Sequence, residues 1–416
     1  MNILFVSEGV APLSGQGSVA ELSGALPKAL RALEHQSYVL SPLYRTISPE
    51  EHSLARRLLK LKHSIGGTEY ACELWTGRTI GGAELVFVGH ESFTGPLEAG
   101  EGQLGAALFI RSAVELIRRN ENGYELVHGH GWLGAAVVSA LKAEGVAIPT
   151  VVTAHASEGP SLKGDAATIA GQDPLRTGLE AADAISEVAP GLLDALGLPS
   201  GSPTIRGGID TAVWNPLTDP KLGARFDPVD LSGKASNKRD LQKALGLAET
   251  NAPLFLVHAA AAFEEHASLF LRNDVQLAVV GGGARFEELA GRWPDRCALL
   301  ASDQLHAAHA AADFVLTLDA TTSLIAHRYG ALPITPRSTS ELLVDCDAKL
   351  RSGTALLTDS AEGEDLLAGM RRAAGAFVTE GFDGARRRVM RIDHGWERCA
   401  RQYARLYSAA QGALAA

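Results

Sequence analysis

The opening stretch, residues 2–33, decides the fold. It reads N-I-L-F-V-S-E, then G-V-A-P-L-S-G-Q-G, then S-V-A-E-L-S-G-A-L-P-K-A-L-R-A-L. Asn2–Ser7 is a continuous apolar run too short for a helix, which is typical of a strand buried on both faces. Ser18 and Glu21 have capping-box spacing, so a helix is predicted to begin at Ser18. A strand, a glycine-rich loop and a helix form the first half of a Rossmann unit, and the first candidate site is therefore Gly9–Ser18.

The same loop also fits a dinucleotide-binding pattern. Gly15–Ala20 matches G-x-G-x-x-G/A. A dinucleotide-binding protein would carry an acidic residue near the end of the second strand to hold the ribose. The second strand is predicted over Ser37–Leu40, and Ser41 and Pro42 follow it instead of an acid. The sequence therefore gives little support to NAD, and no cofactor is expected.

Composition limits the class of protein. A chain of 416 residues is too long for one ordinary core, so two domains are expected. The net charge of −10 argues against a nucleic-acid or anionic-membrane surface, since both need a basic stripe. The four cysteines are far apart and form no metal or redox spacing, which favours a reduced, cytoplasmic protein. No apolar run approaches the length of a signal sequence or a membrane span.

The rest of the chain alternates strand-like and helix-like segments. The polar stretch Leu231–Lys238 is predicted to be a loop that links two domains. Short apolar runs of strand length occur on both sides of it: Glu125–His128, Pro149–Thr153, Pro253–Val257, Val275–Val280, Phe314–Leu318 and Leu332–Thr335. Alternating strands and helices of this kind predict an α/β fold with parallel sheets.

Several short motifs follow these strands in a fixed order. They are His128-Gly129-His130-Gly131-Trp132, Thr153-Ala154-His155-Ala156, Gly207-Gly208-Ile209-Asp210 and Val213-Trp214-Asn215-Pro216. With the opening S-E-G-V-A-P-L, they resemble segments of the bacterial glycogen synthases and plant starch synthases. In that family the corresponding motifs are His-x-His-Asp-Trp-His, Thr-x-His-Asn, Asn-Gly-Ile-Asp and Val-Trp-Asn-Pro. The last is the most specific match, because no general rule of folding demands Trp-Asn-Pro there.

The resemblance implies a particular architecture and chemistry. It implies the GT-B fold, with two Rossmann-like domains facing across a cleft, and retaining glucosyl transfer from ADP-glucose. The first domain is then expected over 1–235 and the second over 236–385. The final helix, within 386–416, is expected to cross back to the first domain. The segment between His155 and Ala182 looks shorter than its counterpart on the acceptor side of the family.

The residues with which the family binds the donor are largely absent. Its Lys-Thr-Gly-Gly loop corresponds to Gly15, Gln16, Gly17 and Ser18, and its arginine and lysine in the second domain correspond to Ala260 and Glu265. Charged hydrogen bonds contribute about 1.5–3 kcal/mol each, so losing that pair is expected to cost about 3–6 kcal/mol of donor binding. Its sugar-contacting glutamate has no counterpart in Leu318–Thr322. The nearest cations by sequence, Arg285 and Arg337, are weak candidates to replace those lost.

Other positions keep a polar residue and could form a remnant of the donor site. The predicted remnant consists of Gly15, Gln16, Gly17, Ser18, His130, Asp210, Thr321 and Thr322. His155 is implied to contact substrate and is the one candidate catalytic residue, although a lone histidine at a strand end is more often simply buried and hydrogen-bonded. Thr321 and Thr322 open a helix that could hold an anion, but Asp319 favours simple capping.

Two further interpretations concern the histidines and the motif near residue 210. His128, His130 and His155 end neighbouring strands and could converge on a metal, but no carboxylate or cysteine accompanies them at ligand spacing, so no metal site is expected. Asp210 and Trp214 are predicted to tie the two domains together.

Two functions remain open from the sequence. The first is an inactive pseudo-glycosyltransferase that keeps the scaffold for binding, regulation or assembly, with α-glucan or an active synthase as partner and with weak or no nucleotide-sugar binding. The second is an active transferase with a changed donor or acceptor. The acidic residues around 259–266 favour the first, and they predict a cleft that is narrower or more acidic than in an active synthase.

Overall fold

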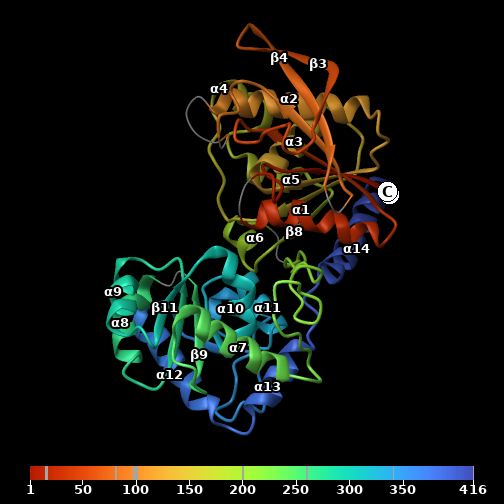
Figure 1. Cartoon of the computed structure of the whole chain (residues 1–416). Coiled ribbons are helices and arrows are strands. Elements are labelled where there is room, and N and C mark those ends of the chain that lie inside the picture. Colours follow the sequence, from red (N-terminus) through yellow and green to blue (C-terminus); the bar gives the residue numbers. More distant parts are fainter. Residues whose placement is uncertain are drawn as a thin grey trace. The chain divides into compact units, whose positions relative to one another are not determined.

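The chain folds into two compact α/β units (Figure 1). The structure is a computed structural model that describes residues 1–14, 17–79, 82–95, 97, 102–198, 201–258, 261–340 and 342–415. Unit 1 comprises Met1–Gly207 and Trp396–Ala416, and unit 2 comprises Gly208–Gly395. None of the described helices is long and apolar enough to cross a membrane.

Unit 1 is built on an eight-stranded sheet in the order β3-β4-β5-β2-β1-β6-β7-β8. Its strands are β1 Asn2–Val6, β2 Gln36–Leu43, β3 Ala55–Ile65, β4 Thr68–Arg78, β5 Glu84–Gly89, β6 Leu126–His130, β7 Thr150–Ala154 and β8 Ala184–Glu187. The six strands from β5 to β8 in this order run parallel, and β3 and β4 form an antiparallel hairpin at the edge. The parallel part is the Rossmann-like sheet that the opening stretch predicted.

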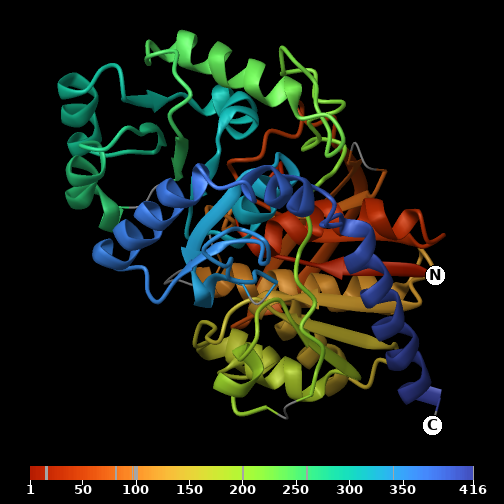
Figure 2. The same cartoon turned by 90° about the horizontal axis from the view of Figure 1, so that it is seen from below.

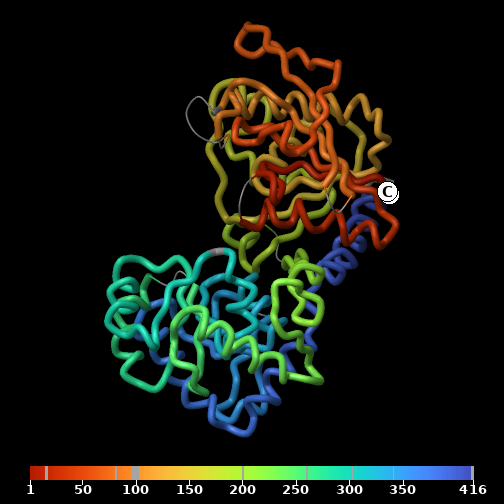
Figure 3. The backbone as a smooth tube through the Cα atoms, in the orientation of Figure 1, coloured from red at the N-terminus to blue at the C-terminus, as the bar shows by residue number. Residues whose placement is uncertain are grey.

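Helices cover both faces of this sheet. They are α1 Ser18–Arg31, α2 Gly102–Arg119, α3 Gly131–Ala143, α4 Gly164–Ala170, α5 Pro174–Ala181, α6 Leu192–Ala195 and α14 Trp396–Ala415. Ile3 and Phe5 pack with α1 and α14, while Leu4 and Val6 pack with α2 and α3. Alternate residues of β1 thus enter cores on opposite faces, as a continuous apolar strand requires. The C-terminal helix α14 lies beside α1 (Figures 2 and 3).

Unit 2 is built on a six-stranded parallel sheet in the order β11-β10-β9-β12-β13-β14. Its strands are β9 Leu254–His258, β10 Gln276–Val280, β11 Cys297–Leu300, β12 Phe314–Leu316, β13 Leu332–Pro336 and β14 Leu356–Thr358. Its helices are α7 Ser232–Leu245, α8 Ala261–Phe270, α9 Ala284–Arg292, α10 Leu305–Ala311, α11 Ala320–Arg328, α12 Gly363–Phe377 and α13 Phe382–Met390, with short 3₁₀ turns at Ser302–Gln304 and Arg337–Thr339. Both units therefore have the α/β architecture that the sequence predicted.

The units divide after Gly207, earlier than the expected boundary at 235. Residues 208–231 belong to unit 2 because their aromatic side chains pack there: Trp214 stacks on His306 with 4.2 Å between ring centroids, and Phe226 contacts Tyr329. The ring of Trp214 packs on side chains of unit 2, and the predicted tie between the domains stays a prediction.

The stretch Leu231–Lys238 is not the polar loop that was expected. It forms the start of α7, where Lys234 is fully enclosed and its Nζ donates to the carbonyl oxygens of Tyr329 at 2.8 Å and Ala310 at 3.1 Å. Burial holds the pKa of the Lys234 amino group well below its usual value. Lys234 is buried, but its hydrogen-bond partners lie far away in the sequence. The residues around it therefore show no local apolar pattern, and from the sequence alone this segment looked like a polar linker.

The start of α1 also differs in detail from the prediction. The helix does begin at Ser18, but its N-cap is Gly17, and no side chain caps it. The predicted Ser18–Glu21 capping box is therefore wrong. Ser18 is the first helical residue, and its hydroxyl contacts His155, which follows strand β7.

Candidate functional site

Three predicted site residues of unit 1 meet at the carboxyl edge of its sheet. His130 ends β6, His155 follows β7, and Ser18 opens α1. The Ser18 hydroxyl lies 2.9 Å from His155 Nδ1, and His155 Nε2 lies 3.3 Å from His130 Nδ1. Gly17 precedes them with a positive φ of 82°, while Gly15 and Gln16 lie outside the described residues. The carboxyl ends of parallel strands are where such folds bind ligands, so this trio is the candidate site in unit 1.

A buried polar network centred on His128 lies next to the trio, where the rings of His128 and His130 are in contact. His128 Nδ1 lies 2.9 Å from the Tyr407 hydroxyl on α14, and its Nε2 lies 2.7 Å from Thr153 Oγ1. The Thr153 hydroxyl also contacts Ser186 Oγ at 2.8 Å. His128 is thus a hydrogen-bonded core histidine. Its partner Tyr407 is separated from it by most of the chain, and no local pattern could have predicted that contact.

Burial keeps these histidines neutral. It lowers the pKa values of His128 and His130 well below the usual value, and it lowers the pKa of His155 to about 3. A neutral imidazole can donate one hydrogen bond and accept another, but it supplies no positive charge. No group of three or more histidine, cysteine, aspartate or glutamate residues in the described ranges is arranged to hold a metal ion. The trio can therefore bind the hydroxyl groups of a ligand but cannot neutralise a diphosphate.

A second feature of this edge is a pocket beside β2 and β5. It has a volume of about 460 Å³ and includes the first residues after both strands. Its lining combines two aromatic side chains with polar and charged ones: Tyr44, Arg45, Glu73, Trp75, His90 and Glu91, together with Leu43, Ile47, Ala71 and Gly89. Aromatic walls with a few polar groups are typical of small-molecule sites. No pattern in the sequence indicated this pocket, because its lining comes from β2, β4, β5 and the residues after them, at positions with no common motif.

The predicted remnant residues of unit 2 are engaged in local structure. Thr321 and Thr322 lie in the first turn of α11, where the Asp319 carboxylate accepts a hydrogen bond from the Thr322 amide at 2.6 Å. Asp210 accepts from the Ala212 amide at 2.9 Å, in the turn before Trp214. The N-terminus of α11 therefore holds a carboxylate from its own chain, as the capping interpretation expected.

Another carboxylate occupies the loops after β9 and β10. Glu264, in the first turn of α8, accepts a hydrogen bond from the Gly283 amide through Oε1 at 3.1 Å. Gly283 is the N-cap of α9, a position where backbone N–H groups point outward and favour an anion. Glu265 beside it is exposed, while Ala259 and Ala260 lie outside the described residues. The contact joins two residues that are 19 positions apart, and no motif in the sequence indicated it.

The two cations considered as replacements are both paired with carboxylates. Arg337 lies 3.3 Å from Asp345 and 3.4 Å from Asp359, measured between guanidinium nitrogen and carboxylate oxygen. Arg285 forms an ion pair with Glu288 three residues later on α9. Neither side chain is therefore a free positive charge for a phosphate group.

Comparison with known proteins finds similar sequences among the starch and glycogen synthases. Residues 2–202 match the family model described as starch synthase catalytic domain. Glycogen synthases from Anaeromyxobacter sp. strain Fw109-5 and from Myxococcus xanthus are each 28% identical, in alignments that cover 98% of this chain and 99% of the relative. The first alignment runs over 476 positions, so that relative carries segments this 416-residue chain lacks.

Solved structures give the fold. The catalytic domain of starch synthase IV from Arabidopsis thaliana, solved with ADP and acarbose, matches with a TM-score of 0.78 at 21% identity, over 99% of both chains. A trehalose-phosphate synthase from Burkholderia xenovorans matches with a TM-score of 0.58 at 13% identity, over 98% and 99% of the two chains. The predicted fold class is thereby confirmed: the chain has the GT-B fold, and its sequence is similar to those of the starch and glycogen synthases.

Proposed function

We propose that this chain is a catalytically inactive pseudo-glycosyltransferase that acts by binding in α-glucan metabolism. The observation that carries the proposal is the Glu264 carboxylate on the Gly283 amide, 3.1 Å away. In a chain that binds a nucleotide sugar, an outward-pointing helix N-terminus is a natural place for phosphate oxygens. Here an internal carboxylate holds that position, and a phosphate would have to displace it.

Charge is the physical reason for inactivity. Glucosyl transfer from a nucleotide sugar leaves a diphosphate, and negative charge grows on its oxygens in the transition state. Fixed cations or backbone donors normally stabilise that charge, and losing one such donor costs about 10²–10³ in rate. Glu264 and Glu265 add negative charge at the loop after β9, and Arg285 and Arg337 already pair with carboxylates. The neutral His155 cannot compensate for this deficit.

The first prediction is that the purified chain transfers no glucose. With ADP-glucose or UDP-glucose and glycogen, label incorporation is expected to equal the no-enzyme blank, and calorimetry is expected to detect no micromolar donor binding. The triple variant Ala260→Arg, Glu264→Gln, Glu265→Lys should bind ADP at least about tenfold more tightly than the parent, because it introduces two cations and removes the negative charge that lies on the Gly283 amide.

A matched variant separates this local effect from a general change in charge. Glu287→Gln removes an exposed negative charge from the neighbouring helix α9 and should leave ADP binding unchanged. Incorporation well above the blank by the parent would overturn the proposal. Equal ADP binding by parent and triple variant would show that the loop after β9 is not the donor site.

The alternative is an active transferase with a different donor or acceptor. The Ser18–His155–His130 trio favours it, since it forms a hydrogen-bonding surface at the carboxyl edge of unit 1. A panel of sugar nucleotides and sugar phosphates, scored by release of the leaving group, distinguishes the two functions. Turnover with any donor that is abolished by His155→Ala would support the alternative.

The pocket beside β2 and β5 supports α-glucan as the bound partner. Sugars have apolar faces and hydroxyl edges, and Trp75 and Tyr44 beside Arg45, His90 and Glu91 offer surfaces for both. Its volume of about 460 Å³ can accept short oligosaccharides. An active synthase is the second partner to test, by co-purification from the native source.

The second prediction is that maltooligosaccharide binding depends on this pocket. Trp75→Ala and Arg45→Ala should each weaken retention on a glycogen affinity gel, Trp75→Ala by about tenfold or more, because removing an aromatic anchor from a binding pocket has the largest effect. Leu58→Ala is the control, since Leu58 is fully exposed on the same hairpin. Unfolding curves of each variant exclude a loss of fold. If the parent is not retained at all, α-glucan is not the partner.

A further inference from the structure

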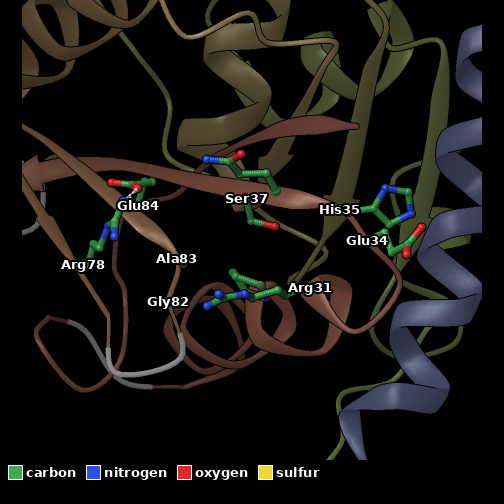
Figure 4. A pocket seen from close by; sticks show the side chains of 10 residues that line it. Arg31, Glu34, His35, Ser37, Arg78, Gly82, Ala83 and Glu84 are labelled. Atoms are coloured by element: carbon green, nitrogen blue, oxygen red, sulfur yellow. Dashed lines mark hydrogen bonds and ion pairs between the residues drawn. The ribbon is translucent and has the colours of Figure 1, made fainter.

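A polar pocket of about 370 Å³ lies in unit 1, away from the candidate site (Figure 4). It is formed where α1 ends and where β2 and β5 begin. Its lining is mostly polar: Arg31, Glu34, His35, Gln36, Ser37, Arg78 and Glu84, with Pro27, Gly82 and Ala83. Because β2 and β5 are parallel to the strands that carry the histidines, the pocket lies at the amino edge of the sheet. It is at the opposite end of α1 from Ser18, about 20 Å along the helix.

Arg31 is the cation of this pocket that no carboxylate neutralises. Within the part of the chain that the structure describes, its guanidinium makes no ion pair or hydrogen bond, whereas the neighbouring Arg78 donates to Glu84 through Nε at 2.8 Å. Figure 4 shows the Arg31 guanidinium beside Gly82, with Glu34 at the other end of the pocket.

Gly82 makes room for that guanidinium. A Cβ atom at Gly82 would lie 2.1 Å from Arg31 Nη1, so any other residue there would push the guanidinium away. The absence of a side chain at Gly82 thus leaves space for the Arg31 guanidinium at the pocket. Its φ of +83° is also one that glycine adopts readily.

Ser37 supplies an unused hydrogen-bonding group. The residue is only 5% exposed and lines the pocket, yet its hydroxyl has no hydrogen-bond partner among the described residues. Figure 4 shows this hydroxyl on the side of β2 that faces Arg31. Buried polar groups are nearly always paired, so the unpaired Ser37 hydroxyl indicates a missing partner in the pocket that the exposed Arg31 also lines.

We propose that this pocket binds a small oxyanion, a carboxylate or phosphate group, as an effector or anchor separate from the candidate site. The planar guanidinium of Arg31 matches two oxygens of such a group, and the Ser37 hydroxyl donates to one of them. The volume admits a small metabolite but no polymer. The pocket belongs to unit 1 alone, and the inference does not depend on whether the chain transfers glucose.

The test measures anion-dependent stabilisation of the full chain. Thermal unfolding is followed while inorganic phosphate, glycerol phosphate or citrate replaces chloride at constant ionic strength. A saturable rise in Tm is expected with at least one of them, and the anion that gives it identifies the phosphate or carboxylate source. Arg31→Gln and Ser37→Ala should each weaken the apparent affinity by roughly tenfold. No saturable rise with any of these anions, or the same loss in the exposed control Arg57→Gln, would overturn the proposal.

A pair of glycine variants tests the role of Gly82 separately. Gly82→Ala should abolish anion-dependent stabilisation by displacing Arg31. Gly67→Ala is the matched control, because Gly67 has a similar φ of +79° but nothing within 4 Å of a Cβ. Both variants carry the same backbone strain, so only the first should lose the anion response. Equal responses in the two variants would contradict the assignment of Arg31.

Discussion

Acidification from about pH 7.5 to about pH 5.5 is expected to destabilise both units by several kcal/mol. The cause is a set of buried histidines whose pKa values are lowered by loss of solvent: His128, His130 and His155 in unit 1, and His309 and His327 in unit 2. In the unfolded chain each imidazole gains a proton as the pH falls through about 6.5, whereas in the folded chain it gains one only far below that.

The unfolded chain therefore binds more protons in this window, and acid favours unfolding. Each such histidine contributes about 1.4 kcal/mol at one pH unit below 6.5, so the three in unit 1 amount to roughly 4 kcal/mol at most. Buried aspartates such as Asp313 change the free energy of unfolding only at lower pH. Salt bridges to Lys238 and Arg386 help to hold the pKa of Asp313 below its usual value, so its contribution is lost only when the pH falls below about 4.

Urea unfolding at the two pH values, followed by fluorescence and circular dichroism, measures this effect. His155→Gln should remove about 1.4 kcal/mol of the difference, because it deletes one titrating group. Ser18→Ala is its control, since it removes the hydrogen-bond partner of His155 but no titrating group. Unfolding free energies that stay constant between the two pH values would contradict the buried, neutral state of these histidines.

The second large effect is expected for Gly134→Ala on α3. A Cβ atom there would lie 2.5 Å from Gly129 on β6 and 2.7 Å from the Val6 carbonyl oxygen on β1. These are backbone atoms of central strands, so no side-chain rotation relieves the contact, and α3 must move away from the sheet. Overpacking of this kind costs about 3 kcal/mol. The displacement would also shift His130, which is the N-cap of α3.

Gly375→Ala is the matched control for this prediction. Gly375 is also inside a helix, α12, but a Cβ atom there meets nothing within 4 Å. That change should stabilise unit 2 by about 0.5–1 kcal/mol, because alanine loses less conformational freedom than glycine in a helix. The two variants should therefore shift the denaturation midpoint in opposite directions. A Gly134→Ala variant as stable as the parent would show that α3 does not approach the sheet this closely.

Much of the fold could be predicted from local patterns. The apolar run Asn2–Val6 became β1, the segment from Ser18 became a helix, and the runs near 254 and 276 became neighbouring parallel strands. Such elements can be recognised in a sequence because burial of one or two faces makes apolar residues recur at regular intervals. The trio Ser18, His130 and His155 could also be anticipated, since parallel strands bring their carboxyl ends to one edge.

Only the tertiary structure decided how the polar groups are used. Tyr407 reaches His128 across 279 positions of the chain, and Glu264 reaches the amide of Gly283 on the next helix. The segment that looked like a linker begins helix α7, where Lys234 is buried and donates to the Tyr329 carbonyl oxygen. Residues 208–231 belong to unit 2 because Trp214 and Phe226 pack there. Hydrogen bonds between distant residues have no period, because each depends on the position of a partner that the neighbouring sequence does not encode. The sequence therefore determined the two α/β scaffolds, whereas packing decided which carboxylate accepts from the N-cap amide of α9 and which histidines stay neutral.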